Sequence, residues 1–306
     1  MTQPRTKIRS VRWIGRVVLA AACAVADNAT ASPIYSVVFD DPGGLNAAFY
    51  AQIESHTLAS GNDWGQYLGG NASLEVVVRF SSSIPRATGR SLTAAFVGSN
   101  GPYNVFEQGA AAELRTGNDP NGLQPDIELV FNPTYVSTVL WFDPDPFSRV
   151  ASVPGTRTDA MSVLLHELGH AFAFNGWRDP FTGLLPGDYE SPWDALTVFD
   201  GTNFYFLGST AVSLYGGPVP VTFGNNSHLG NALPRPGSDL IPDLMNGVVF
   251  FNGNRYRISP MDLAVFDDTG VELRVAAVPE PATLLLTLSG SIGLMIRRRS
   301  TRARHL

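Results

Sequence analysis

The segment SVLLHELGHAFAFNG, residues 162–176, constrains the fold of this chain more than any other stretch of its sequence. Apolar residues recur there at helical spacing and form a wide stripe: Met161, Leu164, Leu165, Leu168, Ala171 and Phe172. Thr158 or Asp159 can cap the N-terminus of such a helix, and Asn175-Gly176 is a typical stop signal at its C-terminus. We therefore expect a buried helix at the centre of the fold.

Two histidines and a glutamate lie within this predicted helix. His166 and His170 are four residues apart, so they share one face and both imidazoles can bind a single ion. Glu167 lies one step round the helix, close enough to hold a water on that ion without binding it. This H-E-x-x-H arrangement is typical of zinc hydrolases, in which the carboxylate is the general base. The segment predicts a Zn²⁺ site with Glu167 as the catalytic residue.

A zinc ion in such a site needs a third protein ligand, and the nearest candidates are poor. Glu190, with Asp194 four residues later, has a spacing that suggests the glutamate ligand of thermolysin-like enzymes, but Pro192 interrupts the helix that would carry it. The compact metzincin motif continues with a glycine and a third histidine. This chain has Ala173 and Gly176 at those two positions, so the compact motif is absent.

Two further histidines of the body remain. His56 falls in a predicted helix over residues 44–58 and is expected to be an ordinary, partly exposed histidine. His228 lies 58 residues after His170 in a polar loop. Its residue type suits zinc, and a surface histidine is the alternative. His228 is therefore the main candidate for the third ligand.

Four blocks between about residues 126 and 270 resemble the leishmanolysin-type metzincins: HELGHAFAF, SHL, DLMN and MDLAVFDDTG. The resemblance implies a zincin fold of the α+β class, with a twisted mixed sheet, a central H-E-x-x-H helix and an irregular C-terminal half. It also implies that His228 is the third zinc ligand and that Met245 forms the Met-turn under the metal. For Met245, an ordinary core methionine is the alternative.

The chain departs from that family at two positions. Ala173 replaces the glycine at which the family's chain turns after the helix, so the turn is expected at Asn175-Gly176. No tyrosine follows Met245 closely, which removes a candidate for stabilising an oxyanion. Tyr215 and Tyr256 are the tyrosines left to consider for that role.

Other segments predict strands before the central helix and one helix after it. SLEVVVRF (73–80) is typical of a buried strand, and PDIELVFNP (125–133) alternates like a strand with one covered face. STVLWFDPDP (137–146) is expected to continue that strand or to form a hairpin with it. Ser259-Pro260 predicts the start of a closing helix that ends at Gly270. This order indicates an α+β fold.

Residues 1–31 are typical of a signal peptide. Arg5, Lys7, Arg9, Arg12 and Arg16 precede the apolar run VVLAAACAVA and the small-residue exit Ala29-Thr30-Ala31. The apolar run is short for a membrane-spanning helix, which favours a cleaved peptide. We expect cleavage after Ala31.

Residues 276–306 are typical of a second targeting segment. Pro279-Glu280-Pro281 precedes a mostly apolar stretch and five arginines, an order that suits a short transmembrane anchor with its basic end in the cytoplasm. The same order resembles the PEP-CTERM sorting signal of Gram-negative bacteria. The resemblance implies processing by an exosortase and a secreted or cell-surface protein. The body, residues 32–275, is expected to be one zinc metallopeptidase domain.

The charge of the body limits its partners. Without the two terminal segments it keeps 11 arginines against 25 acidic residues, a net charge of −14, and it has no cysteine. Nucleic acid is a poor partner for such a surface, and disulfides cannot stabilise the body. Ca²⁺ suits this acidity, although no complete loop motif is present. Candidate turn residues for Ca²⁺ are Asp119, Asn121, Asp143, Asp145 and Asp239.

These patterns predict a secreted zinc-dependent endopeptidase that acts on protein or peptide substrates. The strand at 125–133 directly precedes the zinc helix, and its edge is expected to bind an extended peptide. One alternative is an extracellular matrix or adhesion protein with a structural or vestigial zinc site. Another is a zinc hydrolase acting on a non-peptide amide or ester. The presence of Glu167 favours an enzyme, because a structural site has no use for a base.

Overall fold

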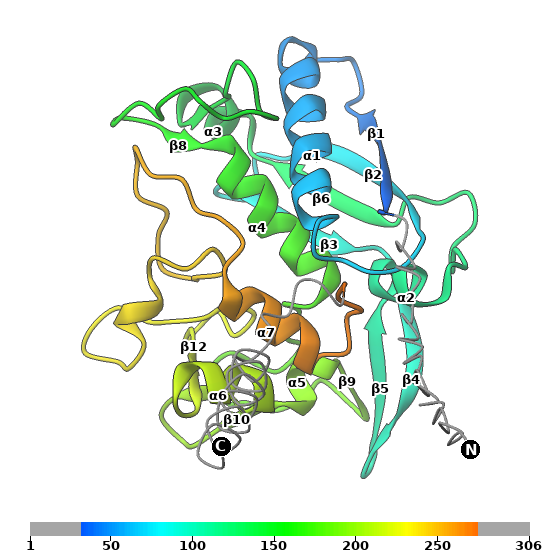
Figure 1. Ribbon diagram of the computed structural model, residues 1–306, viewed down its shortest axis with the longest axis vertical. Helices are drawn as coiled ribbons and strands as arrows, with labels where there is room; N and C mark the ends of the chain where they lie inside the picture. The colour runs from blue at the N-terminus through cyan, green and yellow to red at the C-terminus, as the bar shows by residue number, and fades with distance from the viewer. Residues whose placement is uncertain (1–31, 275–306) are drawn as a thin grey trace, which may run out of the picture.

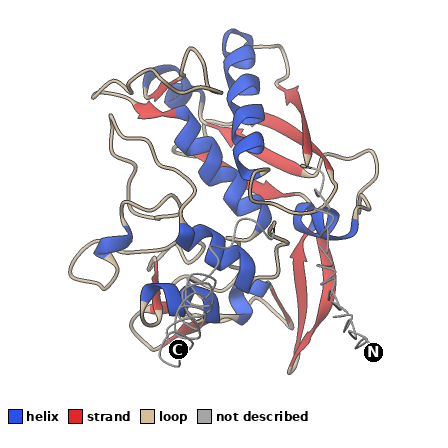
Figure 2. Ribbon diagram, viewed as in Figure 1, coloured by secondary structure: helices blue, strands red, loops and turns tan. Residues whose placement is uncertain are grey.

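The computed structural model describes residues 32–274 and has the α+β architecture that the sequence predicts (Figure 1). A four-stranded sheet belongs to the N-terminal half, and short helices with small sheets make up much of the C-terminal half (Figure 2). The predicted signal peptide, 1–31, and sorting segment, 276–306, lie outside the described residues. Within 32–274, no helix combines the length and apolar character needed to cross a bilayer.

The main sheet has the strand order β1-β2-β6-β3. Its strands are β1 (Ile34–Asp40), β2 (Ser73–Phe80), β6 (Ile127–Phe131) and β3 (Ala87–Ser91). Strands β1, β2 and β6 run parallel, whereas β3 pairs antiparallel with β6 and forms an edge of the sheet. The strand predicted at 73–80 is confirmed with the same bounds.

Strand β6 lies inside the sheet, and this position contradicts two expectations about it. Both faces of β6 are largely covered, since Glu128 is buried as well as the apolar residues. The carboxylate of Glu128 forms ion pairs with Arg79 and Arg90. In addition, β6 has a neighbouring strand on each side, so it offers no edge to a peptide. The edge strand on this side of the sheet is β3.

Helices α1 (Tyr50–Trp64) and α4 (Ala160–Phe172) lie side by side against the main sheet (Figure 1). The indole Nε1 of Trp64 donates a hydrogen bond to the Leu165 carbonyl at 3.0 Å, which fixes the two helices to each other. Helix α4 packs closely on β3 as well, so the predicted central helix is confirmed in type and place.

Helix α1 differs in its bounds from the helix expected over 44–58. A 3₁₀ turn, η1 (Ala47–Phe49), precedes it, and α1 continues to Trp64 through the weak helix formers of residues 60–64. Gly61 lies so close to the Tyr35 ring that a Cβ atom would come within 2.5 Å of it. Packing on β1 therefore maintains a helical end that local propensity does not predict.

The expectation of a partly exposed His56 is wrong. Its ring is buried; Nδ1 lies 2.7 Å from the Gln52 carbonyl oxygen, and Nε2 accepts a hydrogen bond from the Asp143 amide at 2.9 Å. Burial, as the largest cause, lowers the pKa of His56. His56 therefore connects the loop at Asp143 to α1 through this hydrogen bond.

Residues 137–146 neither continue β6 nor form a hairpin with it. Helix α3 (Pro133–Thr138) interrupts the chain, because Asn132 caps it through Thr134 N at 2.8 Å and a proline occupies its first turn. Strand β7 (Leu140–Trp141) then pairs in parallel with β8 (Thr158–Asp159), directly before α4.

The remaining elements form two small sheets and several short helices. The hairpin β4 (Ala94–Asn100) and β5 (Tyr103–Gln108) pairs with β9 (Tyr189–Glu190), and α2 (Gly109–Thr116) follows it. The C-terminal half contains α5 (Pro192–Ala195), β10 (Thr197–Phe199), β11 (Phe204–Phe206), α6 (Ser209–Tyr215), β12 (Val219–Val221) and η2 (Ser238–Leu240). The predicted closing helix is confirmed as α7 (Pro260–Asp268), with Ser259 Oγ accepting from Asp262 N at 3.1 Å.

Candidate metal centre

Helix α4 carries the first two histidines of the site on its buried length. Asp159 caps its N-terminus by accepting a hydrogen bond from Ser162 N at 3.1 Å. The helix ends at Phe172, and Ala173 leaves the helical region with a φ of −139°. The expected stop at Asn175-Gly176 therefore lies three residues too late. The earlier end turns the Phe174 carbonyl toward His170, whose Nδ1 lies 2.6 Å from it.

Hydrogen bonds to three separate segments hold His228 in place. The amide of Thr222 donates to the His228 carbonyl at 2.9 Å, and the amide of Leu229 donates to the Met245 carbonyl at 2.8 Å. Ser227 Oγ accepts from the Gly176 amide at 2.9 Å, which joins the loop to the chain after α4. A residue distant in sequence is thus brought to the face of the helix.

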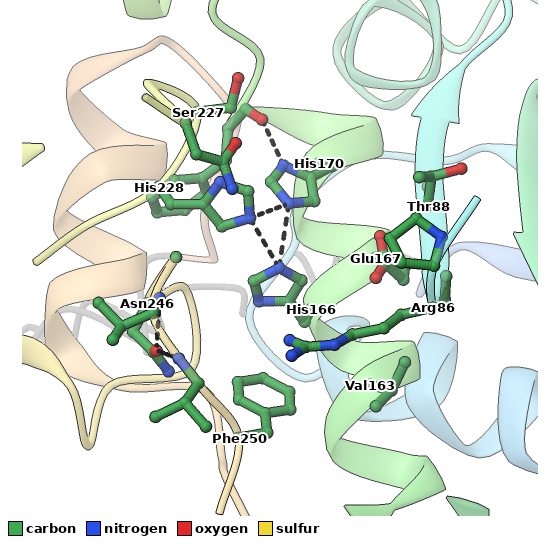
Figure 3. Close-up of a pocket in the computed structure, with 18 of the residues that line it drawn as sticks. Arg86, Thr88, Val163, His166, Glu167, His170, Ser227, His228, Asn246 and Phe250 are labelled. Carbon is green, nitrogen blue, oxygen red and sulfur yellow. Dashed lines mark hydrogen bonds between the residues drawn. The ribbon is translucent and has the colours of Figure 1, made fainter. Parts of the chain in front are cut away.

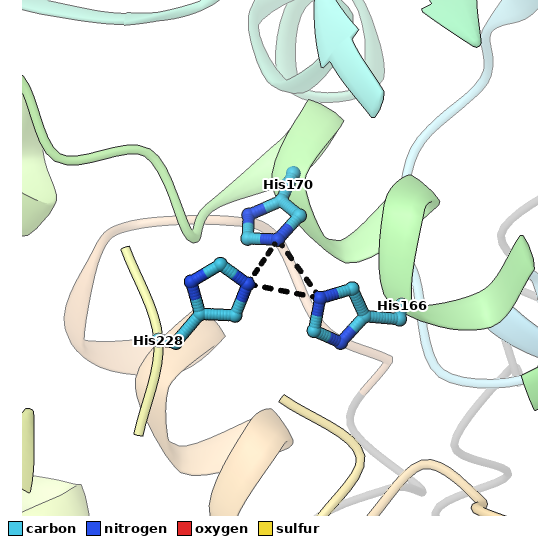
Figure 4. Close-up of side chains that lie close together, drawn as sticks. All are labelled: His166, His170 and His228. Carbon is cyan, nitrogen blue, oxygen red and sulfur yellow. Dashed lines mark hydrogen bonds between the residues drawn. The ribbon is translucent and has the colours of Figure 1, made fainter. Parts of the chain in front are cut away.

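The imidazoles of His166, His170 and His228 meet at their Nε2 atoms (Figure 4). The Nε2 atom of His166 lies 3.1 Å from that of His170 and 3.0 Å from that of His228, and the third separation is 3.0 Å. In a tetrahedral zinc site with Zn–N bonds of about 2.05 Å, neighbouring nitrogens lie about 3.3 Å apart. The triangle is close to this size.

The opposite ring atoms indicate which nitrogens carry protons. The Nδ1 atom of His166 lies 2.8 Å from the Leu244 carbonyl oxygen, and that of His170 lies near the Phe174 carbonyl oxygen. A carbonyl only accepts, so we assign the ring proton to Nδ1 in both residues. Each Nε2 then has a lone pair directed at the other nitrogens. Lone pairs at this distance repel, and a cation between them would remove the repulsion.

Burial keeps these rings neutral. Burial, followed by the neighbouring His170, lowers the pKa of His166 to about 3, and burial lowers the pKa of His170 to about 4. Burial and the two other imidazoles lower the pKa of His228 well below its ordinary value, against the opposing effect of the Asn225 backbone. Neutral imidazole is the form that binds a metal ion. The three residues could therefore hold one.

Glu167 projects from α4 into the same cleft as the histidines (Figure 3). Its side chain is buried, and burial raises its pKa to about 8, with the Gly89 backbone opposing the shift. A Cβ atom on Gly89 would come within 2.2 Å of the Glu167 carbonyl oxygen and 2.7 Å of its Cβ. Gly89 therefore allows α4 to approach the edge strand β3 more closely than any other residue would.

Met245 lies in the core beneath α4. Its side chain is fully buried, and a Cβ atom on Gly169 would come within 2.7 Å of its Sδ. The glycine between the two helical histidines thus makes room for the methionine. The preceding residue, Leu244, provides the carbonyl that contacts His166. The segment Asp243–Asn246 therefore both positions a site histidine and fills the space under the helix.

A cleft of about 530 Å³ opens onto this centre and is bordered by residues 85–89, 225–228 and 246–250. The sequence did not single out Arg86 or Tyr135, which line it. Within 32–274 no ion pair involves Arg86, whose side chain extends across the cleft toward His166 (Figure 3). Burial raises the pKa of Tyr135 to about 12, and Glu167 adds to the shift. No local motif marks Arg86 and Tyr135, because only the packing of β3 and α3 beside α4 brings them to the cleft.

The other tyrosine and carboxylate candidates lie elsewhere. Tyr215 donates to Asp239 at 3.1 Å, and the Tyr256 hydroxyl accepts from Phe251 N at 3.0 Å; neither lines the cleft. Glu190 accepts from Asn100 at 2.8 Å and pairs with Arg178, and Asp194 completes the capping box of α5. The thermolysin-like ligand arrangement does not form.

Comparison of the chain with models of known protein families, with curated proteins and with solved structures finds no match. Conclusions about this centre therefore depend on its own geometry. That geometry consists of three imidazole nitrogens in a tight triangle, a buried carboxylate beside them and an open cleft with a strand edge along one wall.

Proposed function

We propose that the chain is a zinc-dependent endopeptidase with a zincin fold of the metzincin type. The observation that carries the proposal is the convergence of three Nε2 atoms, in His166, His170 and His228, beside the buried carboxylate of Glu167. Three neutral imidazoles suit Zn²⁺, and a zinc site with three protein ligands keeps a position for water or substrate. A carboxylate that does not bind the metal is what a hydrolase needs as a base.

In this proposal the zinc ion and Glu167 have separate roles in the reaction. When bound, the zinc ion would supply a positive charge that acidifies a water and polarises a substrate carbonyl. Glu167 would accept the proton of the attacking water and deliver it to the leaving nitrogen. Burial raises the pKa of Glu167 to about 8, so its carboxyl group is suited to gain and lose a proton near neutral pH.

The outer edge of β3 is the proposed position of the substrate backbone. In an antiparallel strand, alternate residues direct their amides and carbonyls to opposite sides. The Arg86 carbonyl accepts from Asn132 N at 2.7 Å, so Arg86 and Thr88 bond toward β6. The backbone groups of Ala87 and Gly89 consequently point toward the cleft. A peptide added there would gain main-chain hydrogen bonds and little sequence selectivity.

In the same proposal the turn Asp243–Asn246 acts as the Met-turn. Its Leu244 carbonyl fixes the ring of His166, and the Met245 side chain supports α4 at Gly169. This arrangement gives the turn a physical role, because the orientation of a metal-binding imidazole is set by the partner of its other nitrogen.

The test combines metal analysis with a protease assay. We expect the purified protein to contain one zinc ion and to hydrolyse casein, and a chelator should abolish this activity. Glu167→Ala should keep the zinc and lose at least 100-fold in activity, the lower range for loss of a general base. The matched control is Glu54→Ala, since Glu54 is an exposed glutamate of α1.

A matrix or adhesion protein with a structural zinc site is the competing function. It predicts full zinc occupancy without turnover of casein or of ester and amide substrates, and no effect of Glu167→Ala. Turnover of small esters or amides without casein hydrolysis would instead indicate a non-peptide hydrolase. Either result would reject the endopeptidase.

A further inference from the structure

A second cluster of possible metal ligands involves α2, β2 and the loop that precedes β6. Glu113 of α2 and Asp119 and Asp126 of that loop each place one carboxylate oxygen within 4.8 Å of the others. Glu75 of β2 is adjacent to them, since its amide donates to Asp126 Oδ2 at 2.9 Å. None of these residues is a ligand candidate of the histidine centre.

Two oxygens of this cluster are buried and have no hydrogen-bond partner in the described part of the chain. Glu113 is 3% exposed; its Oε1 accepts from the Ser73 amide at 2.8 Å, but its Oε2 has no partner. Asp126 is 0% exposed, and its Oδ1 likewise has no partner. A buried carboxylate oxygen without a donor is costly in free energy, so each atom needs either a proton shared with a neighbouring carboxyl group or a positive group.

The protein itself supplies no such group. Across residues 32–274, no ion pair includes Glu75, Glu113, Asp119 or Asp126, and the adjacent Arg115 pairs with Glu107 instead. Burial raises the pKa of Glu113 to about 7 against the opposing effect of the Ser73 amide, and the charge of Asp126 and a side-chain hydrogen bond to it add to the shift. Burial also raises the pKa of Glu75, followed by a side-chain hydrogen bond to Asp126. Without a cation the cluster therefore retains protons, which a bound cation would displace.

The loop before β6 is shaped so that it brings an exposed carboxylate to the buried pair. Asp119 Oδ1 accepts from the amides of Asn121 and Gly122 at 2.8 and 2.7 Å. The Asn121 side chain donates to the Pro125 carbonyl at 3.0 Å, while its own Oδ1 makes no hydrogen bond to any described residue. These hydrogen bonds hold the loop in the conformation that presents the Asp119 carboxylate to the buried pair.

We propose that Glu113, Asp119 and Asp126 bind a Ca²⁺ ion. All the available donors are oxygens, which favours a hard cation over zinc. Two ligands of one Ca²⁺ ion, each at about 2.5 Å from it, lie at most about 5 Å apart, and the three carboxylate oxygens, all within 4.8 Å of one another, satisfy this condition. Asp119 is exposed, so waters can complete the coordination.

The bound ion would have a structural role, because its ligands come from α2 and from the loop. Two of these ligands, Glu113 and Asp126, also accept hydrogen bonds from amides of β2. The Asp126 carbonyl also accepts from Leu92 N at 2.8 Å, directly after β3. The loop leads into β6, the strand on which the edge strand β3 is paired. Calcium should therefore stabilise the fold without taking part in the chemistry of the histidine centre.

The experiment measures thermal unfolding of the full chain, loaded with zinc and freed of calcium, as CaCl₂ is added. Ligand linkage predicts a rise in Tm of about 5–10 °C at a free Ca²⁺ concentration 100 times its Kd. MgCl₂ at the same concentrations should raise Tm less, because Mg²⁺ requires a smaller, strictly octahedral site. Zinc content, measured in parallel, should not change.

Glu113→Gln and Asp126→Asn keep the side-chain shape and the backbone contacts of each residue but remove the charge. Each should weaken calcium binding at least 10-fold by isothermal titration. Asp119→Asn changes an exposed residue, so it tests the site even if the two buried variants fail to fold. Glu54→Gln on α1 is the matched control and should bind as the unchanged chain does. An unchanged Tm up to 10 mM Ca²⁺, or an unchanged Kd in Asp119→Asn, would overturn the proposal.

Discussion

Replacing Gly89 by alanine tests whether the close approach of β3 to α4 positions the candidate base. The added Cβ would lie 2.2 Å from the carbonyl oxygen and 2.6 Å from the carbonyl carbon of Glu167. Both are backbone atoms of a buried helix, so rotation of a side chain cannot relieve the contact. Strand β3 must move by about 1 Å, because real Cβ contacts with a backbone oxygen rarely fall below about 3.2 Å.

Two opposing effects determine the expected change in the free energy of unfolding of Gly89→Ala. Overpacking of this kind costs about 1–3 kcal/mol, while replacing a strand glycine by alanine recovers about 0.5 kcal/mol of backbone entropy. We expect a net loss of about 0.5–2.5 kcal/mol, which lowers Tm by about 1–10 °C in a domain of this size. A displacement of about 1 Å between the base and the substrate edge should also lower kcat/KM by about 100-fold.

The assay pairs thermal unfolding with zinc analysis and casein hydrolysis. Gly155→Ala is the control, because Gly155 is exposed and a Cβ there would contact nothing within 4 Å. Zinc should remain bound in Gly89→Ala, since β3 contributes no ligand. If Gly89→Ala were as stable and as active as Gly155→Ala, the proposed role of this strand edge would be refuted.

Three further predictions follow from contacts of the histidine centre, and a fourth follows from the sequence of residues 1–31. His228→Ala should weaken zinc binding by more than the roughly 10- to 100-fold typical of a lost supporting contact, as measured by competition with a chelator; equal affinity would remove His228 from the site. Gly169→Ala should destabilise the protein by about 1 kcal/mol in denaturant unfolding, but should be neutral or stabilising in a Met245→Ala background, where the 2.7 Å contact with Sδ is gone. The pKa values of His166 and His170 are lowered to about 3 and about 4, so the stability that their neutral rings contribute is full above pH 6.5 and declines progressively as the pH falls to about 4, while the rings of the folded protein stay unprotonated until the pH nears 4. Zinc content after dialysis should therefore be unchanged at pH 5.5 and reduced below pH 4. Release of zinc between pH 7 and 6 would contradict the low pKa values of the two histidines. After expression in a Gram-negative host, mass spectrometry of the purified protein should find a mature N-terminus directly after Ala31, whereas an intact N-terminus would rule out the predicted cleavage.

Local sequence patterns were sufficient for the elements whose bonds are local. The H-E-x-x-H helix, strand β2 and the Ser259 cap of α7 are present as predicted, and Asp159, one of the two predicted caps, begins the H-E-x-x-H helix. The shared face of His166 and His170 follows from helical geometry alone, since residues four apart lie one above the other. These features are determined by hydrogen bonds and side chains within a few residues of each other.

Features that depend on distant contacts were predicted less well. The sequence made His228 a candidate, but only the β12 loop and the turn at Met245 place its ring against α4. The peptide-binding edge was predicted at β6, but β6 is an inner strand and the edge strand is β3, because β3 joins the sheet beyond β6 although it precedes it in the chain. The burial of His56 depends on the loop at Asp143, which no local pattern links to α1.

By itself, the sequence of this protein determined a helix that presents two imidazoles and a carboxylate, and the acidic character of the body around it. Tertiary structure alone decided which third imidazole reaches that helix, which strand lines the cleft, and that Glu113, Asp119 and Asp126 converge with two buried oxygens lacking a partner. The physical reason is the range of the interactions. Helical periodicity acts over four residues, whereas tertiary packing brings into contact segments that are far apart in the sequence.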